Sequence, residues 1–189
     1  MDINDLLKER NWSMYKLSAR SEVPYTTIND LCNYRTSIER CSGETIYRLA
    51  KTLNVSMEDL LSEAMEKRLP FMSFKSNVCH LVKSKGDLPF IIEVIKSNDI
   101  RKYFNRRWHL ESLYLLGMID YLCRMNDLPL NKDYDDLRDY RIDETVYPSG
   151  ILLKSILFKD DMYKIQAYND SIPEFRRFNI VENEVRNVV

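Results

Sequence analysis

The first 65 residues carry apolar side chains at the three- and four-residue spacing of short amphipathic helices. Five segments follow this pattern. Three of them begin after a serine suited to accept a hydrogen bond from the helix start, and Ser56 is followed by Asp59 in a variant of the capping box. The predicted helices cover residues 4–10, 14–20 (after Ser13) and 25–32, a segment after Ser42 with Ile46, Leu49, Ala50 and Leu53 inward, and a segment after Ser56 with Leu60 and Leu61 inward.

The third of these helices follows a short turn, Ser21-Glu22-Val23. Pro24 then supplies a fixed φ that suits the first turn of a helix. Ile28 and Leu31 lie on one side of this helix, which is about two turns long. The pattern therefore predicts a short helix with one buried edge.

The remaining chain is also predominantly helical in its pattern, and its strongest segment is 108–125. This segment carries a broad apolar stripe and is predicted to be the central helix of the second half. The stripe comprises Leu110, Leu113, Tyr114, Met118, Tyr121, Leu122 and Met125, widened by Leu115, Leu116 and Ile119. Two earlier helices are predicted from Phe74, Val78, Leu81 and Val82 and from Phe90, Ile91, Val94 and Ile95.

Three later segments are less regular. Residues 133–144 are acidic and ambiguous, residues 150–168 contain an apolar run that fits a helix, and the tail 175–189 fits a helix or a strand. The charged stretch 63–73 contains Pro70 and is predicted to separate two domains, 1–65 and 74–189, with residues 66–73 as the linker.

Composition narrows the class of protein. The 189 residues are 44% apolar and 30% charged, as in a folded globular protein. The longest apolar run, 113–119, is far shorter than the roughly 20 residues that span a bilayer, and the acidic start does not resemble a secretory signal. We therefore expect a cytoplasmic protein without a membrane partner. Its four cysteines lack C-x-x-C spacing and are expected to be reduced thiols, most of them packed.

The charge balance limits the affinity for nucleic acid. The net charge is −1, but residues 8–40 hold six Lys or Arg against four Asp or Glu, a local balance of +2. A modest positive face is expected, so non-specific affinity for DNA should be weak. Specific binding would then depend on dimerisation and on contacts to bases.

The order of capped helix, three-residue turn and short helix is the plan of a helix-turn-helix unit, in which the second helix of the pair enters a DNA major groove. The sequence resembles the Cro/C1-type (Xre) helix-turn-helix family. The resemblance covers residues 3–61 and implies a five-helix, lambda-repressor-like domain, followed here by a predominantly helical C-terminal domain. It is carried by WSMYKLS at 12–18, VPYTTINDL at 23–31 and TIYRLAKTLNVSMEDLL at 45–61.

The resemblance also implies roles for individual residues in binding double-stranded DNA. The helix at 24–31 becomes the recognition helix, and its outward residues become candidate base readers, because Asn can pair with adenine and Asp can accept from cytosine. Residues at the start of the preceding helix, and others around the recognition helix, become phosphate contacts that fix register. The base readers are Tyr25, Thr26, Asn29 and Asp30, and the backbone contacts are Ser13, Tyr15, Lys16, Thr27, Asn33 and Arg35.

Two positions depart from the family pattern. Glu22 occupies a turn position where the family usually has glycine, which matters if the backbone there needs a positive φ. Asp30 places an acid on the DNA-facing side, and the sequence suggests no neighbour that neutralises it.

Other chemistry-bearing residues have competing interpretations. The basic, aromatic segment 101–109 fits binding to nucleic acid, binding to an acidic partner, or a solvated helix end whose aromatic rings belong to the core. Cys79, His80, His109 and Cys123 lack the paired spacing of a zinc site, so no metal or cofactor is predicted. The acids of 133–143 fit a hydrated surface, a cation site, a DNA mimic or contact with a basic partner.

Together these observations predict a regulator that binds an inverted-repeat operator as a homodimer, most simply a repressor. The C-terminal domain is expected to dimerise or to bind a second protein, such as the toxin of a toxin-antitoxin pair. Two alternatives remain open at this point: an enzyme targeted by its helix-turn-helix, and a protein-interaction module. Because no nucleophile-base motif is present, we expect that the chain is not an enzyme.

Overall fold

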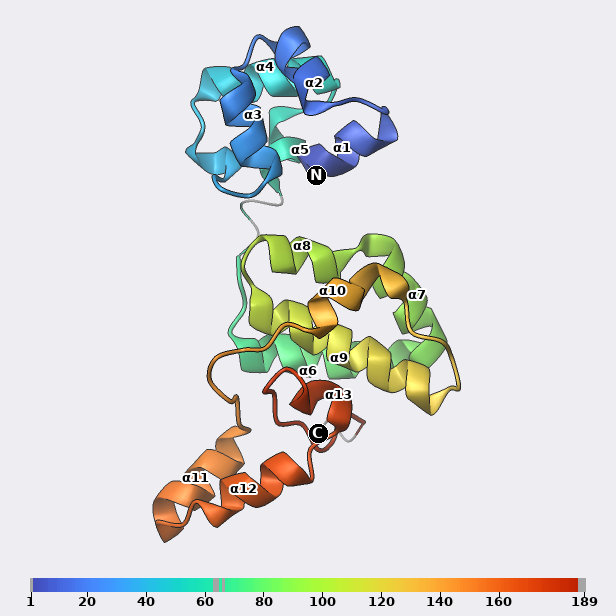
Figure 1. The fold of residues 1–189 in the computed structure, drawn as a ribbon, viewed down its shortest axis with the longest axis vertical. Helices are drawn as coiled ribbons and strands as arrows, with labels where there is room; N and C mark the ends of the chain where they lie inside the picture. Colours follow the sequence, from blue (N-terminus) through green and yellow to red (C-terminus); the bar gives the residue numbers. More distant parts are fainter. Residues whose placement is uncertain (1, 63–64, 66, 187–189) are drawn as a thin grey trace. The chain divides into compact units, whose positions relative to one another are not determined.

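The computed structural model describes residues 2–62, 65 and 67–186, and divides the chain into two compact units (Figure 1). We call Met1–Arg68 the N-terminal unit and Leu69–Val189 the C-terminal unit. Residues 1, 63–64, 66 and 187–189, which include parts of the predicted boundary and of the tail, lie outside the described residues. Within the described residues all regular structure is helical, which confirms the predicted fold class.

The N-terminal unit contains the five predicted helices around one apolar core. The core is formed by residues at the predicted inward positions, and Leu17, Leu49 and Leu53 are fully buried in it. A short 3-10 helix, Ile38–Arg40, interrupts the long connection between the third and fourth helices. The helices are α1 (Ile3–Glu9), α2 (Met14–Ser21), α3 (Tyr25–Cys32), α4 (Gly43–Leu53) and α5 (Met57–Ser62).

The predicted serine caps are present at the starts of three helices. The Ser13 and Ser42 hydroxyls each accept a hydrogen bond from a backbone N–H three residues later, at 3.2 Å. At α5 the bonds are reciprocal: Ser56 Oγ accepts from the Asp59 N–H at 2.9 Å, and the Asp59 carboxylate accepts from the Ser56 N–H at 3.3 Å. The capping box is therefore confirmed, and it fixes where α5 begins.

The turn between α2 and α3 has the backbone conformation that the family usually assigns to glycine. Glu22 adopts φ 57° and ψ 20°, in the left-handed region, which costs a non-glycine residue about 1 kcal/mol. Arg48 of α4 donates to the Glu22 carbonyl oxygen at 3.3 Å, and Ser18 donates to the Val23 carbonyl at 2.8 Å. Contacts on both sides of the turn thus hold a backbone that its own residue disfavours.

The C-terminal unit is built around α9 (His109–Met125), as predicted. Every residue from Glu111 to Asp120 is buried, so this helix is enclosed on all sides rather than on one stripe. The helices that surround it are α6 (Phe71–Lys85), α7 (Asp87–Ser97), α8 (Asp99–Asn105), α10 (Asp135–Arg138) and α13 (Pro173–Arg176), together with the 3-10 helix Lys132–Tyr134.

Gly117 lies where α9 and α13 approach most closely. A Cβ atom at this position would lie 2.9 Å from Cδ1 of Phe175 and 3.2 Å from the Glu174 carbonyl oxygen. Phe175 is fully buried. The absence of a side chain at 117 is therefore what allows the two helices to pack this closely.

We expect Gly117→Ala to lower the free energy of unfolding of the C-terminal unit by about 1–2 kcal/mol, because overpacking outweighs the gain in helix propensity. Thermal unfolding followed by circular dichroism would measure the change. Gly150→Ala in α11 (Ser149–Phe158) is the matched control, since no atom lies within 4 Å of its added Cβ. The packing argument would be contradicted if Gly117→Ala lowered the free energy of unfolding no more than the control does.

Two predicted inward residues are exposed, and the tail is not regular. Leu81 of α6 is 40% exposed and Met125 at the end of α9 is 50% exposed, so neither contributes its side chain to the core although both helices are present. Each lies at the edge of its stripe, where the helix surface turns toward solvent. The described tail after α13 forms neither of the predicted elements; it runs irregularly and makes one parallel bridge, Val146 to Ile180.

A buried polar cluster attaches this tail to α6 and α9. The Tyr114 hydroxyl donates to the Glu182 carboxylate at 3.2 Å, and Lys75 pairs with the same carboxylate. Cys79 Sγ lies 3.3 Å from the Tyr114 hydroxyl, and burial raises the pKa of this thiol. Cys79, Cys32 and Cys123 are buried, Cys41 is partly exposed, and all four are free thiols, as predicted.

The last two long helices form a hairpin. The helices α11 and α12 (Met162–Asn169) pack against each other and project from the rest of the C-terminal unit (Figure 1). None of their described residues belongs to the apolar core around α9. The predicted helix over 150–168 is thus confirmed as two helices, separated at Lys159, which adopts a positive φ.

Candidate nucleic-acid interface

The helix α3 presents two chemically different edges. Ile28 and Leu31 are 1% and 6% exposed and lie in the core of the N-terminal unit. On the other edge, Tyr25 is 48% exposed and Thr26 is also exposed, while Asn29 and Asp30 are partly exposed. The four predicted base readers therefore share the outward edge of one helix. Whether they contact bases stays a prediction.

Asn29 is held in place by a neighbour one turn further along. The side-chain amide of Asn33 donates to the Asn29 side-chain oxygen at 2.9 Å and to the Asn29 carbonyl at 2.8 Å. Restraining one side-chain rotamer reduces the entropy lost when an amide pairs with a base.

Asp30 has a cationic neighbour, contrary to the expectation from sequence. A guanidinium nitrogen of Arg35 lies 3.6 Å from the Asp30 carboxylate, and both side chains are substantially exposed. The Asp30 carbonyl also accepts the N–H groups of Arg35 and Thr36, at 2.8 and 3.3 Å. This turn folds the chain back over the end of α3 and brings Arg35 beside Asp30. Their separation along the sequence did not indicate this contact.

The start of α2 places the predicted backbone contacts at the surface. Ser13, Tyr15 and Lys16 are all exposed, and Tyr15 is 75% exposed, the largest value among the exposed apolar or aromatic side chains of the described residues. Thr27 is partly exposed, and Asn33 and Arg35 are exposed near the end of α3. Hydroxyl, amide and cationic groups thus lie at both ends of the helix pair, as contacts to a phosphate backbone require.

Trp12, Lys16 and Arg20 form a cation-π group that the sequence predictions did not include as a unit. The Lys16 ammonium lies 5.2 Å, and the Arg20 guanidinium 4.5 Å, from the Trp12 ring. The available signal was the spacing of four residues, which places Lys16 and Arg20 on one face of α2 with Trp12 just before the helix. The ring orders two cations on α2 without neutralising them.

A shallow surface hollow connects the two helices of the pair. It brings together Ser13 and Tyr15 of the α2 start with Tyr25 of α3, three of the predicted site residues. Trp12 also lines it, as do Asn4, Leu7, Lys8 and Met14. The α2 start and the first residue of α3 therefore line one hollow, together with residues of α1.

The basic segment 101–109 is integrated into the C-terminal unit. The Trp108 ring stacks on Tyr103 at 5.5 Å, and His109 stacks on Phe104 at 4.8 Å. Tyr103 and Phe104 pack against the apolar core, which favours the interpretation as a helix end with core aromatics. Arg101 is engaged in an ion pair with Asp136.

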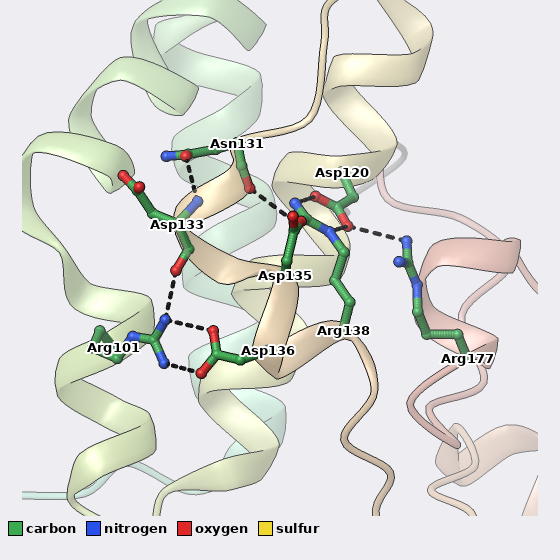
Figure 2. Close-up of polar contacts among 8 residues, drawn as sticks. All are labelled: Arg101, Asp120, Asn131, Asp133, Asp135, Asp136, Arg138 and Arg177. Carbon is green, nitrogen blue, oxygen red and sulfur yellow. Dashed lines mark hydrogen bonds and ion pairs between the residues drawn. The ribbon is translucent and has the colours of Figure 1, made fainter.

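The acidic segment meets arginines of its own chain, as Figure 2 shows. Arg101 donates to both carboxylate oxygens of Asp136, at 2.7 and 2.8 Å. Arg138 donates to Asp135 at 2.6 Å and to the buried Asp120 of α9 at 2.8 and 2.9 Å. Asp135 and Asp136 are nevertheless 67% and 63% exposed, which fits the interpretation of this segment as a hydrated surface.

Two of the four Cys and His residues that lack zinc-site spacing contact tyrosine hydroxyls. His109 Nδ1 lies 2.8 Å from the Tyr140 hydroxyl, and Cys79 contacts Tyr114. Within the described part of the chain, no three His, Cys, Asp or Glu side chains are grouped so that they would hold a metal ion. No helix among the described residues has the length and apolar character needed to cross a membrane.

Comparison with known families agrees with this geometry. Residues 2–62 match the family model of the Cro/C1-type helix-turn-helix DNA-binding domain. The predicted resemblance of the N-terminal third of the chain to this family is thus confirmed. No curated protein and no solved structure matches the chain.

Proposed function

We propose that the chain is a sequence-specific transcriptional repressor that binds an inverted-repeat operator as a dimer. The observation that carries this proposal is the two-edged α3 of a Cro/C1-type domain, with Ile28 and Leu31 in the core and Thr26 and Asn29 outward. In helix-turn-helix dimers of this kind two recognition helices enter major grooves about 34 Å apart, or a multiple of that distance. Repression then follows from occupying the chain's own promoter.

The charge of the N-terminal unit supports a mode of binding that depends on base contacts. The acids of its surface limit the non-specific attraction to phosphates. Within α3, Thr26 offers a methyl group for thymine and Asn29 offers a paired donor and acceptor for adenine. Ser13 and Lys16 are exposed at the α2 start, where helix-turn-helix proteins contact the backbone.

Replacing Thr26 and Asn29 together by alanine tests the proposal. We expect affinity for the operator to fall about 100-fold or more, because each good base contact contributes roughly 1–3 kcal/mol of discrimination. Affinity for unrelated DNA should change little. Gel-shift titration against the chain's own promoter and against scrambled DNA, each at two salt concentrations, measures both quantities.

The matched control replaces two exposed residues of α6, Ser73 and Asn77, by alanine. Control and test proteins should both melt as the wild type does, since all four side chains lie at the surface. A wild-type protein that shifts DNA without sequence preference, or that does not shift DNA at low salt, would overturn the repressor proposal. A large fall in melting temperature in the test protein would show that α3 is positioned differently.

A narrower form of the proposal concerns the C-terminal unit. In this form of the proposal, the chain is the antitoxin of a toxin-antitoxin pair, and its N-terminal unit represses the operon that encodes both proteins. The presence of a second compact unit beside the DNA-binding domain supports this form. Co-expression with the neighbouring gene and purification under native conditions tests it: recovery of the chain without that product would count against the antitoxin role.

A further inference from the structure

The α11–α12 hairpin carries a concentration of exposed apolar side chains. We call these six residues the hairpin patch, and each is between 50% and 71% exposed. Four lie on α11 and two on α12, so the patch covers both helices of the hairpin. The hairpin patch consists of Leu153, Ile156, Leu157, Phe158, Met162 and Ile165.

The patch does not arise from an ordinary surface helix. A surface helix places its apolar residues toward the core and its polar residues outward. In α11 the order is reversed: the buried side chain is Ser155, whose hydroxyl donates to the Asp161 carboxylate at 3.0 Å, while aliphatic side chains are exposed. A helix that is apolar on its outer side is typical of one that another element covers.

The exposed aliphatic residues of α11 form one stripe. Leu153, Ile156 and Leu157 fall within about 100° of one another around the helix axis, on the side away from Ser155. No charged residue lies within this stripe; Lys154 falls beside it. The stripe therefore offers a continuous apolar ridge of the kind that packs into the grooves of a facing helix.

The area of the patch fits one side of a stable interface. The five patch residues other than Phe158, which lies about 100° beyond Leu157 around α11, expose roughly 550 Å² per copy, or about 1,100 Å² over two copies, against the roughly 1,000 Å² that a specific interface requires. Residues 149–169 hold three lysines and two aspartates, so two copies of the hairpin would not repel each other strongly. Size, apolar character and near-neutral charge together fit a surface that binds itself.

We propose that the hairpin patch is the dimer interface, and that its partner is the same hairpin of a second copy of this chain. Two hairpins then form a four-helix arrangement with a shared apolar core, related by a two-fold axis as in most homodimers. The choice of partner rests on the proposed function, which requires two copies on one operator. An uncharged apolar ridge also suits a self-complementary contact better than a strongly charged partner.

The experiment compares the full chain with Leu153→Glu/Leu157→Glu by sedimentation equilibrium. The wild type is expected at twice the 22.6 kDa of one chain, and the variant at 22.6 kDa. The dimer dissociation constant should rise at least about 100-fold, because four glutamates enter one apolar interface. The matched control, Leu88→Glu/Ile92→Glu, replaces a Leu and an Ile of α7 that are 49% and 52% exposed, and it should remain dimeric.

Circular dichroism distinguishes loss of the dimer from loss of the fold. Variant and control should keep the wild-type helical content, since every replaced side chain is largely exposed. The inference would be overturned if the variant stays dimeric or if the control dissociates equally. It would also be overturned if the wild type is monomeric at 100 μM or is bound only to another gene product.

DNA titration separates this inference from the proposed function. The monomeric variant should still recognise a single half-site while losing the added affinity for the full operator. A dimeric wild type without operator preference would contradict the repressor proposal alone. A monomeric wild type that discriminates its half-site would contradict the dimer interface alone.

Discussion

Replacing Asp120 by asparagine is expected to destabilise the C-terminal unit by about 3 kcal/mol, because the change removes the shared anion of a buried ion network. Asp120 is 1% exposed and accepts hydrogen bonds from Arg138 and, at 3.0 Å, from Arg177 on its other side (Figure 2). The carboxylate raises the pKa of the Arg138 guanidinium, chiefly through hydrogen bonding. Asparagine would instead direct an N–H group toward arginine donors.

The measurement is thermal unfolding of the full chain, in which the transition of the C-terminal unit should fall by about 10 °C. Asp136→Asn is the control, since the pair of Asp136 with Arg101 lies near the surface and contributes at most about 1 kcal/mol. Arg138→Met should recover part of the loss when combined with Asp120→Asn, because it removes a buried cation whose remaining ion-pair partner is the exposed Asp135. Additive effects of the two changes would contradict the network.

Replacing Leu49 by alanine should unfold much of the N-terminal unit and abolish operator binding. Leu49 is fully buried at the centre of that unit's core, and Leu→Ala at such positions costs about 2–5 kcal/mol. A core in a unit of this size contributes only about 3–5 kcal/mol of stability. The free energy lost by the substitution is therefore comparable with the whole stability of the N-terminal unit.

Two observations test this second expectation. Tyr47→Ala on the same helix is the control, since Tyr47 is 53% exposed and should change the stability by no more than about 0.5 kcal/mol. The C-terminal unit should keep its own thermal transition in Leu49→Ala, because it has a separate apolar core. If Leu49→Ala instead shows a single thermal transition at a lower temperature, the two units unfold together and the expectation is wrong.

Local signals in the sequence were sufficient to predict the N-terminal unit. Serine caps, the fixed φ of Pro24 and the spacing of Leu49 and Leu53 act within a few residues of where they stand. The helix limits and the buried edge of α3 therefore follow from short stretches of sequence, without knowledge of the tertiary fold. The outward placement of Thr26 and Asn29 follows from the same periodicity.

Contacts between distant residues could not be predicted in this way. The pairing of Arg101 with Asp136 spans 35 residues, and that of Asp120 with Arg177 spans 57. Nothing in the local pattern around Asp120, an acid inside an apolar segment, identifies its partners. The exposure of the α11 stripe could not be predicted either, because an apolar run of this length fits a buried core helix as well as a helix at an interface.

In the proposed mode of binding, the contact between Asp30 and Arg35 would couple a base contact of the acid to a phosphate contact of the arginine. A guanidinium 3.6 Å from a carboxylate must weaken that contact to approach a phosphate, and the carboxylate then needs a new donor. The amino group of a cytosine supplies such a donor, whereas a carbonyl at the same place repels the acid. A wrong base opposite Asp30 would therefore weaken binding in two ways. It would lose the hydrogen bond to the Asp30 carboxylate, and Arg35 would stay with Asp30 instead of contacting a phosphate.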